Sequence, residues 1–384
     1  MSVIYLDNAA TTKMWPEVLE SMMPYFAESY GNPSAIYTMG SSGKKAVNKA
    51  RSVIAEAIGA KREEIYFTGG GSESDNWAIK MVAENYAHKG KHIITTNMEH
   101  HAVLHTCEYL ETKGYEVTYL EVDRDGRVKP ETVAGAIRPD TILVSVMFAN
   151  NEVGTLEPIR EIGQITRKAG VLFHTDAVQA FGQLSINVEE LQIDLLSASA
   201  HKIHGPKGVG MLYIRTGVKT GSFLHGGAQE RGRRAGTENV PGIVGFGTAV
   251  RIAHENLEES MRKKVLMRDY LIGRLEREIS DCKLNGHRQE RLPGNVNVAI
   301  SGIEGESALI MLDMQGICAS AGSACTSGSL DPSHVLLAMG LEPALARGSL
   351  RFTLSEETTY EELDKLVEVL EGIVSRLRET LILG

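Results

Sequence analysis

The sequence contains little cysteine and few aromatic residues. Only 4 cysteines occur among 384 residues, and aromatic residues make up 6% of the chain. Four scattered cysteines cannot form the dense disulfide framework of small secreted domains. None of them stands in a CxxC motif or in a Cys/His cluster with the spacing of a zinc site. We therefore expect no structural metal site and no redox pair, and any functional cysteine should act as a single thiol.

Positive charge is also in deficit, and long apolar runs are missing. The net charge of -9 and the pI near 5.8 argue against non-specific nucleic-acid binding, which requires a basic surface. No stretch approaches the length of a membrane span. The opening residues, MSVIYLDNAATTK, lack the basic and apolar regions of a signal peptide. These absences predict a cytoplasmic protein that binds neither membranes nor nucleic acids.

Short apolar runs alternate with polar turns and amphipathic stretches from about residue 62. The runs are EIYF, HIITT, EVTYLEV, TILVSVMF, VLFHT, DLLSAS and GMLYI. Several are apolar at consecutive positions, which is typical of strands buried on both faces of a mainly parallel sheet. The pattern predicts an α/β architecture, in which ligands bind at the polar turns that follow the strands.

The pattern changes beyond about residue 255, where long charged stretches carry apolar residues at helical spacing. One such stripe comprises Leu257, Met261, Val265, Ile272, Leu275 and Ile279, and the other comprises Leu363, Leu366, Val367, Leu370, Ile373, Val374 and Leu377. The second opens with Thr358 and Glu361 at the spacing of a capping box. GNVNVAI and SLRFTL lie between the two stretches and are predicted strands. We predict a large domain of residues 15–255 and a small α+β domain formed by residues 1–14 and 256–384.

Three segments combine polar chemistry with strand ends. In EIYFTGGGSESDNWAIK a strand enters glycines and then a helix, an arrangement that can bind phosphate, although it is also a common plain connection. It is neither a Walker loop nor GxGxxG. Asp176 ends a strand in VLFHTDAVQA, where it could cap a helix or pair with the pyridine nitrogen of pyridoxal phosphate (PLP). Lys202 follows the next strand, and a partly desolvated lysine there can form a Schiff base.

Taken together, these motifs resemble the cysteine desulfurases of the NifS/IscS type, which are fold-type I PLP enzymes of aminotransferase class V. The resemblance extends over essentially the whole chain and rests on LDNAATT, TGGGSES, EHHAV, FANNEVGT, HTDAVQ, SAHKIHGPKG, GGAQERGRRAGTEN, GSACTSGS and RFTLS. It implies a mainly parallel seven-stranded sheet domain plus a smaller α+β domain. It also implies PLP as cofactor, L-cysteine as substrate, and a homodimer that passes sulfur to an iron–sulfur scaffold or another acceptor protein. The GGG run of TGGGSES departs from the family pattern, which keeps backbone phosphate binding possible but leaves individual side-chain contacts there open.

The resemblance assigns roles around the cofactor ring by position. Lys202 would hold PLP and move the Cα proton of the substrate, while His100 would stack on the ring and help as an acid or base. Asp176 would pair with the ring nitrogen. Gln179 would approach the phenolic oxygen, and Asn151 would contact the ring edge or the substrate.

Further roles concern the phosphate and the substrate. The resemblance places four residues at the phosphate, namely Gly71, Ser72, Ser199 and His201. Thr237 would reach the phosphate bound by the neighbouring subunit. Asn8 would lie near the substrate, and Arg351 would bind the substrate carboxylate with its bidentate guanidinium.

The thiol nucleophile implied by the resemblance is Cys325, which would carry the sulfur as a persulfide. It stands in ASAGSACTSGSLDPSH, whose glycine and serine content suits an accessible, movable loop. Cys318 has apolar neighbours and is expected to be buried, whereas Cys107 and Cys282 are expected to be incidental. The alternatives are a selenocysteine lyase, a desulfurase with a shorter cysteine loop, a PLP aminotransferase, or a scaffold protein without turnover.

Overall fold

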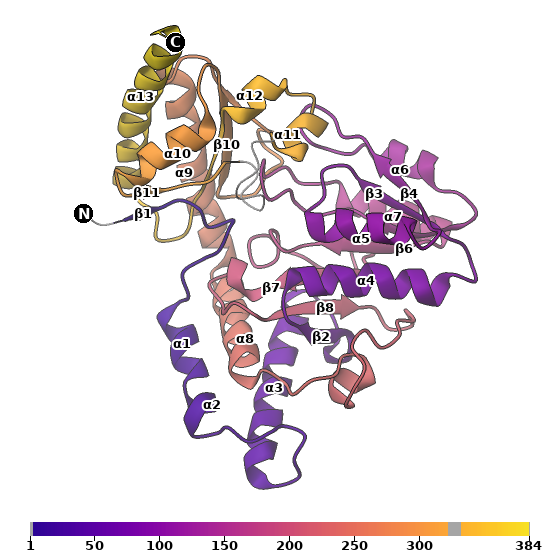
Figure 1. The fold of residues 1–384 in the computed structure, drawn as a ribbon. Coiled ribbons are helices and arrows are strands. Elements are labelled where there is room, and N and C mark those ends of the chain that lie inside the picture. Colours follow the sequence, from indigo (N-terminus) through magenta and orange to yellow (C-terminus); the bar gives the residue numbers. More distant parts are fainter. Residues whose placement is uncertain (1–2, 322–331, 384) are drawn as a thin grey trace.

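The computed structural model describes residues 3–321 and 332–383, and it consists of a large sheet covered by helices beside a smaller sheet-and-helix unit (Figure 1). The large sheet has seven strands in the order β2-β8-β7-β6-β5-β3-β4. Its strands are β2 (Ile65–Thr68), β3 (His92–Thr96), β4 (Glu116–Leu120), β5 (Thr141–Ser145), β6 (Leu172–Asp176), β7 (Leu195–Ser199) and β8 (Gly210–Ile214). Strand β8 pairs antiparallel with both of its neighbours, and the other pairs are parallel. The predicted α/β class and mainly parallel sheet are therefore confirmed.

Helices cover both faces of this sheet, which explains why its strands are apolar at consecutive positions. Leu195 packs into the core on one face, which includes side chains of α4 (Gly71–Tyr86) and α5 (His101–Glu111). The adjacent Leu196 packs into the core on the other face. The helices that contribute to this second core are α1 (Pro16–Met22), α3 (Thr38–Ala57), α6 (Pro130–Ala136), α7 (Ile159–Ala169) and α8 (Val240–Glu255). Successive strand residues thus enter different cores, because strand side chains alternate between the two faces.

The smaller unit has its own core. Its sheet has the order β12-β10-β9, formed by β9 (Cys282–Leu284), β10 (Asn295–Ile300) and β12 (Ser349–Thr353). The strands predicted from GNVNVAI and SLRFTL are confirmed. Helices α9 (Leu257–Glu278), α10 (Gly305–Asp313) and α13 (Tyr360–Leu383) contribute to this core, whereas α11 (His334–Ala338) and α12 (Pro343–Arg347) contribute to a separate cluster with Met98, Met147 and Val153. The N-terminal β1 (Ile4–Tyr5) pairs in parallel with β11 (Ile317–Cys318). The domain boundaries at residues 14 and 255 stay a prediction.

The remaining elements are short. They are α2 (Pro24–Ala27) and three 3-10 helices, η1 (Arg62–Glu64), η2 (Ala200–Lys202) and η3 (Gln229–Gly232). Within residues 3–321 and 332–383, no helix is both long enough and apolar enough to cross a membrane.

Two local predictions are wrong. The capping box of α13 is formed by Thr359 and Glu362, whose side chains each accept the backbone N–H of the other residue at 3.3 and 3.0 Å. The hydroxyl of Thr358 instead accepts the backbone N–H of Ser355, so the cap falls one residue later than predicted. Cys318 is half-buried rather than buried, because Ile317 points into the core and the next side chain of the strand points away from it.

Candidate active site

A cavity of about 450 Å³ lies at the carboxyl ends of the parallel strands β6 and β7. Ten residues predicted from the sequence line it, namely Gly71, Ser72, His100, Asn151, Asp176, Gln179, Ser199, His201, Lys202 and Arg351. These residues come from many parts of the chain. They meet because the carboxyl ends of parallel strands lie at one edge of a sheet.

Lys202 ends η2, directly after β7. Its Nζ donates hydrogen bonds to the carbonyl oxygens of Ala9 at 2.5 Å and Ala10 at 2.8 Å. Gln179 Nε2 donates to the same Ala9 oxygen at 3.0 Å. The N-terminal segment therefore forms one wall of the cavity and contacts the candidate Schiff-base lysine directly.

Asp176, the last residue of β6, is buried at the cavity wall. Burial raises the pKa of its carboxyl to about 6, although the backbone N–H of Val178 (2.9 Å) and the charge of Lys202 counteract the shift. Asp75 lines the same cavity, and burial together with the charge of Asp176 raises its pKa well above the usual range. His174 Nε2 lies 3.7 Å from Asp75 Oδ1, but burial lowers the pKa of His174 to about 3, so this ring supplies no counter-charge.

Two buried carboxyl groups thus face one cavity, an arrangement that favours a cationic ligand group beside Asp176. The sequence reasoning missed Asp75. Asp75 stands four residues after Gly71 on α4, so the two residues lie on the same face of the helix, one turn apart. This spacing could have indicated that Asp75 also faces the cavity.

His100 caps the N-terminus of α5, where its Nδ1 accepts the backbone N–H of Ala102 at 3.1 Å. Burial lowers its pKa to about 4, and the charges of Lys202 and two neighbouring histidines add to the shift. The ring is therefore neutral at physiological pH. Because Nδ1 accepts a hydrogen bond, the single ring proton resides on Nε2.

The glycine turn after β2 forms the other end of the cavity. Gly70 has a φ of 153°, and α4 begins at the next residue with 16 residues in its helix. A Cβ at Gly71 would lie 2.6 Å from Val178 Cγ2, so only glycine fits there. An adjoining pocket of about 570 Å³ is lined by residues 69–73 together with Ser199 and His201. Free N–H groups at a helix N-terminus suit a phosphate.

Arg351 lies on β12 and is fully buried. Its Nη1 donates to the carbonyl oxygen of Asn151 at 2.9 Å, and its Nη2 donates to Asp7 Oδ1 at 2.8 Å. Arg351 Nε has no hydrogen-bond partner among the described residues. These two bonds use two of the five N–H donors of the guanidinium, and the remaining donors at a cavity wall can bind a substrate carboxylate. Asp7 was missed, although it stands in the LDNAATT motif.

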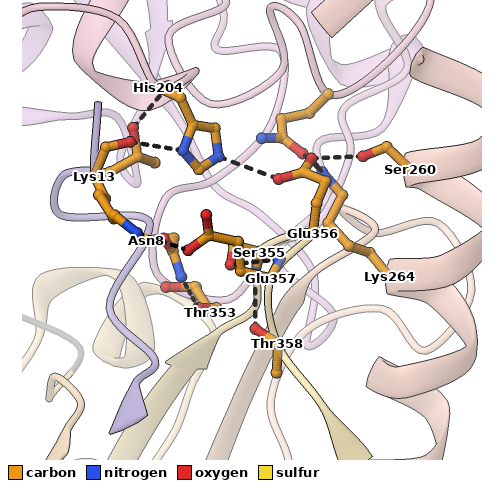
Figure 2. Close-up of polar contacts among 12 residues, drawn as sticks. Asn8, Lys13, His204, Ser260, Lys264, Thr353, Ser355, Glu356, Glu357 and Thr358 are labelled. Atoms are coloured by element: carbon orange, nitrogen blue, oxygen red, sulfur yellow. Dashed lines mark hydrogen bonds and ion pairs between the residues drawn. The ribbon is translucent and has the colours of Figure 1, made fainter. Parts of the chain in front are cut away.

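Three predicted residues do not line the main cavity. Asn8 borders a smaller neighbouring pocket and donates through Nδ2 to the carbonyl oxygen of Thr353 at 2.7 Å (Figure 2). Thr237 is exposed and Cys325 lies outside the described residues. On either side of it, Ser320 exchanges backbone hydrogen bonds with Arg351, and Ser333 Oγ donates to Glu152 at 2.5 Å.

Comparison with known proteins shows similarity over nearly the whole chain. Residues 4–366 match the aminotransferase class-V family. The chain is 56% identical over 375 residues to the cysteine desulfurase IscS of Methanosarcina thermophila, covering 98% of this chain and 93% of that protein. Its structure resembles a NifS-like protein with a TM-score of 0.92 and 40% identity, covering 97% and 99% of the two chains. It also resembles SspA in complex with cysteine, with a TM-score of 0.83, 37% identity and coverage of 93% and 100%.

Proposed function

This chain belongs to the aminotransferase class-V family and, within it, to the cysteine desulfurases, and we propose that it uses PLP to move the sulfur of L-cysteine onto Cys325, leaving alanine. One observation carries the proposal: Lys202, Asp176 and Arg351 line a single cavity. An amine, a carboxylate and a guanidinium there match the three groups that such a reaction on an amino acid needs.

The residues around the cavity fit PLP. Asp176 is a buried carboxylate with a raised pKa, and a protonated ring nitrogen would supply a counter-charge for it. The helix N-terminus at Gly71 and Ser72 would hold the phosphate, and Lys202 would hold the cofactor covalently. When bound, PLP withdraws electrons from the substrate Cα.

The chain's own residues supply the other steps. Arg351 would bind the substrate carboxylate, and the amine of Lys202 would accept the Cα proton. His100 would donate a hydrogen bond from Nε2 in the same cavity. The Cys325 thiolate then attacks the substrate sulfur, forming an S–S bond while the Cβ–S bond breaks. The electron pair of the broken bond stays on carbon, which takes up protons to become alanine, and the sulfur remains on Cys325 as a persulfide.

The working form in this proposal is a homodimer with an acceptor protein for the sulfur, such as an iron–sulfur scaffold. Large apolar side chains are exposed on and after α1 and α2, namely Leu19, Met23, Phe26 and Tyr30. Such a patch suits a second copy of the chain. Thr237 would then reach the neighbouring subunit's phosphate. Sedimentation should show a dimer, and a fully active monomer would refute this part.

Lys202→Ala tests the proposed function most directly. The wild-type protein, incubated with PLP and L-cysteine without a keto acid, should release alanine, and borohydride should fix PLP to the chain. Lys202→Ala should show neither result, because the amine that holds the cofactor is absent. Lys44→Ala, at an exposed lysine of α3, is the matched control and should behave as wild type. If borohydride fixed PLP to the wild-type chain but no alanine were released, the assignment of PLP as cofactor would stand and the proposed desulfurase reaction would be refuted.

A further inference from the structure

His204, two residues after Lys202, lies between two hydrogen-bond acceptors from distant parts of the chain. Its Nδ1 is 2.8 Å from the carbonyl oxygen of Lys13, and its Nε2 is 3.1 Å from Glu356 Oε2 (Figure 2). Its ring also stacks on Trp15, with centroids 4.4 Å apart. We propose that His204 carries a proton on both ring nitrogens and, paired with Glu356, is a positioning residue that holds residues 9–15, here called the strap, against Lys202.

The hydrogen-bond partners determine the protonation of the ring. A backbone carbonyl can only accept, so Nδ1 must donate to Lys13. Glu356 Oε1 already accepts from Ser260 Oγ at 2.6 Å and from Lys264 Nζ at 2.8 Å. Burial alone would raise the pKa of Glu356, but the hydrogen bond from His204 and the charge of Lys264 bring it far below its usual range. An ionised carboxylate only accepts, so Nε2 donates as well.

The strap connects His204 to the candidate Schiff-base lysine. The backbone N–H of His204 donates to Thr12 Oγ1 at 2.7 Å, and its carbonyl oxygen accepts the N–H of Trp15 at 3.2 Å. At the other end of the strap, Ala9 and Ala10 accept the hydrogen bonds of Lys202 Nζ. His204 itself does not line the cavity. It therefore acts on Lys202 through the strap.

The backbone of His204 supports the same conclusion. Its φ is 62°, in the left-handed region that non-glycine residues rarely adopt. Contacts with Thr12, Lys13, Trp15 and Glu356 hold it there. A residue held in a disfavoured conformation by several independent contacts is typical of a functional region.

Several charged groups surround His204 and Glu356. Lys264, on α9, is fully buried and donates both to Glu356 and to Gln183. Lys263 Nζ, on the same helix, donates to the carbonyl oxygen of Glu356 at 2.5 Å. The ammonium group of Lys13 itself points to Glu357 at 3.3 Å. The Glu356 carboxylate thus accepts hydrogen bonds from both Lys264 and His204, and among the described residues no other carboxylate pairs with the ring.

The proposal rests on the assigned role of Lys202, but its test needs neither cofactor nor cysteine. In the cofactor-free, full-length protein, amide hydrogen exchange of Thr12 and Trp15 and the rate of Lys202 acylation are measured at pH 6.5 and 8.5. Each variant is compared with wild type at the same pH. His204→Phe keeps an aromatic ring on Trp15 but loses both donors. Glu356→Gln keeps an acceptor for Nε2 but loses the charge. His254→Phe, at an exposed histidine of α8, is the control.

We expect His204→Phe to speed exchange of the strap about tenfold at both pH values. Acylation of Lys202 should rise in parallel. Glu356→Gln should resemble wild type at pH 6.5 and His204→Phe at pH 8.5, because the neutral amide gives the His204 ring no counter-charge. Amides of β5 and β6 should stay protected in every variant, which shows that the fold is retained.

If Glu356→Gln lost the same protection of the strap from amide exchange at both pH values, His204 would be only a packing contact and the proposal would be overturned. A ¹⁵N spectrum of the wild-type His204 ring at pH 7 showing only one protonated nitrogen would overturn it as well. If the wild-type protein released no alanine, the proposed function would fail, but the exchange and acylation measurements would not change because they use neither cofactor nor cysteine. A failure of the proposed function can therefore be told apart from a failure of this inference.

Discussion

Arg351 Nη2 donates to Asp7 Oδ1 across 2.8 Å, although the two residues stand 344 positions apart in the chain. The pair brings the first motif of the sequence to the last strand of the smaller sheet. Asp7 and the carbonyl oxygen of Asn151 hold the guanidinium at the cavity wall, and its Nε is the donor without a partner among the described residues. Asp7 therefore sets the direction of the group that is proposed to bind the substrate carboxylate.

Arg351→Lys should raise the KM for cysteine about tenfold or more, while PLP binding is retained. Lysine keeps the positive charge, but it cannot contact Asp7, Asn151 and a carboxylate with one planar group. Steady-state alanine formation measures the effect. Arg347→Lys, at an exposed arginine of α12, should leave KM unchanged. An unchanged KM in Arg351→Lys would remove Arg351 from the substrate site.

Asp176→Asn should bind PLP but lower kcat about a hundredfold, because the ring nitrogen loses the anion that holds its proton. The asparagine oxygen can still accept the N–H of Val178, so the local backbone should be retained. Asp75→Asn provides the comparison. Burial and the charge of Asp176 raise the pKa of Asp75 and so disfavour its ionised form, and replacing it by the neutral amide should therefore cost less activity than the same change at Asp176. Equal losses in the two variants would contradict the assignment of Asp176.

Glu152→Gln should change how stability depends on pH. Burial raises the pKa of Glu152 to about 7 from 4.5, although Ser333 and Arg351 oppose the shift. The native state therefore holds a proton that the unfolded state releases between these pH values. The contribution to stability is complete below pH 4.5 and is lost as pH rises through 7, by at most about 1.4 kcal/mol per pH unit.

The variant has no such proton, so its free energy of unfolding relative to wild type should increase between pH 5 and pH 8. Urea unfolding of the cofactor-free protein at both pH values measures this difference. A constant difference would show that Glu152 is ionised throughout.

Mass spectrometry after mixing with cysteine should find added sulfur on Cys325 alone. Burial raises the pKa of Cys282 to about 12 and that of Cys107 further still, so both remain unreactive thiols. Burial also raises the pKa of Cys318, which is half-buried. Cys325→Ser should retain PLP but release little alanine. Cys318→Ala should still form both alanine and the persulfide on Cys325. The reverse pattern would assign the nucleophile to Cys318.

Much of the fold could be predicted because its signals are local. Consecutive apolar residues such as Leu195 and Leu196 indicated a strand covered on both faces, and the structure places them in different cores. Asp176 and Lys202 could be predicted to lie near each other because Asp176 ends one strand and Lys202 closely follows the next strand of one parallel sheet. The position of the α13 cap could not be predicted, because Thr358 and Thr359 each stand three residues before a glutamate. Only the hydrogen bond from Ser355 to Thr358 leaves Thr359 as the capping residue.

The amino-acid sequence by itself determined which segments become buried strands and which chemical groups gather at their carboxyl ends, since side-chain periodicity and strand ends are properties of short stretches. Only the tertiary structure decided how those groups are partnered. Arg351 with Asp7, Asp75 with Asp176 and His204 with Glu356 are pairs between segments far apart in the chain. No local pattern specifies them, because the burial that shifts a pKa and the acceptor that holds a proton exist only once distant segments have packed together.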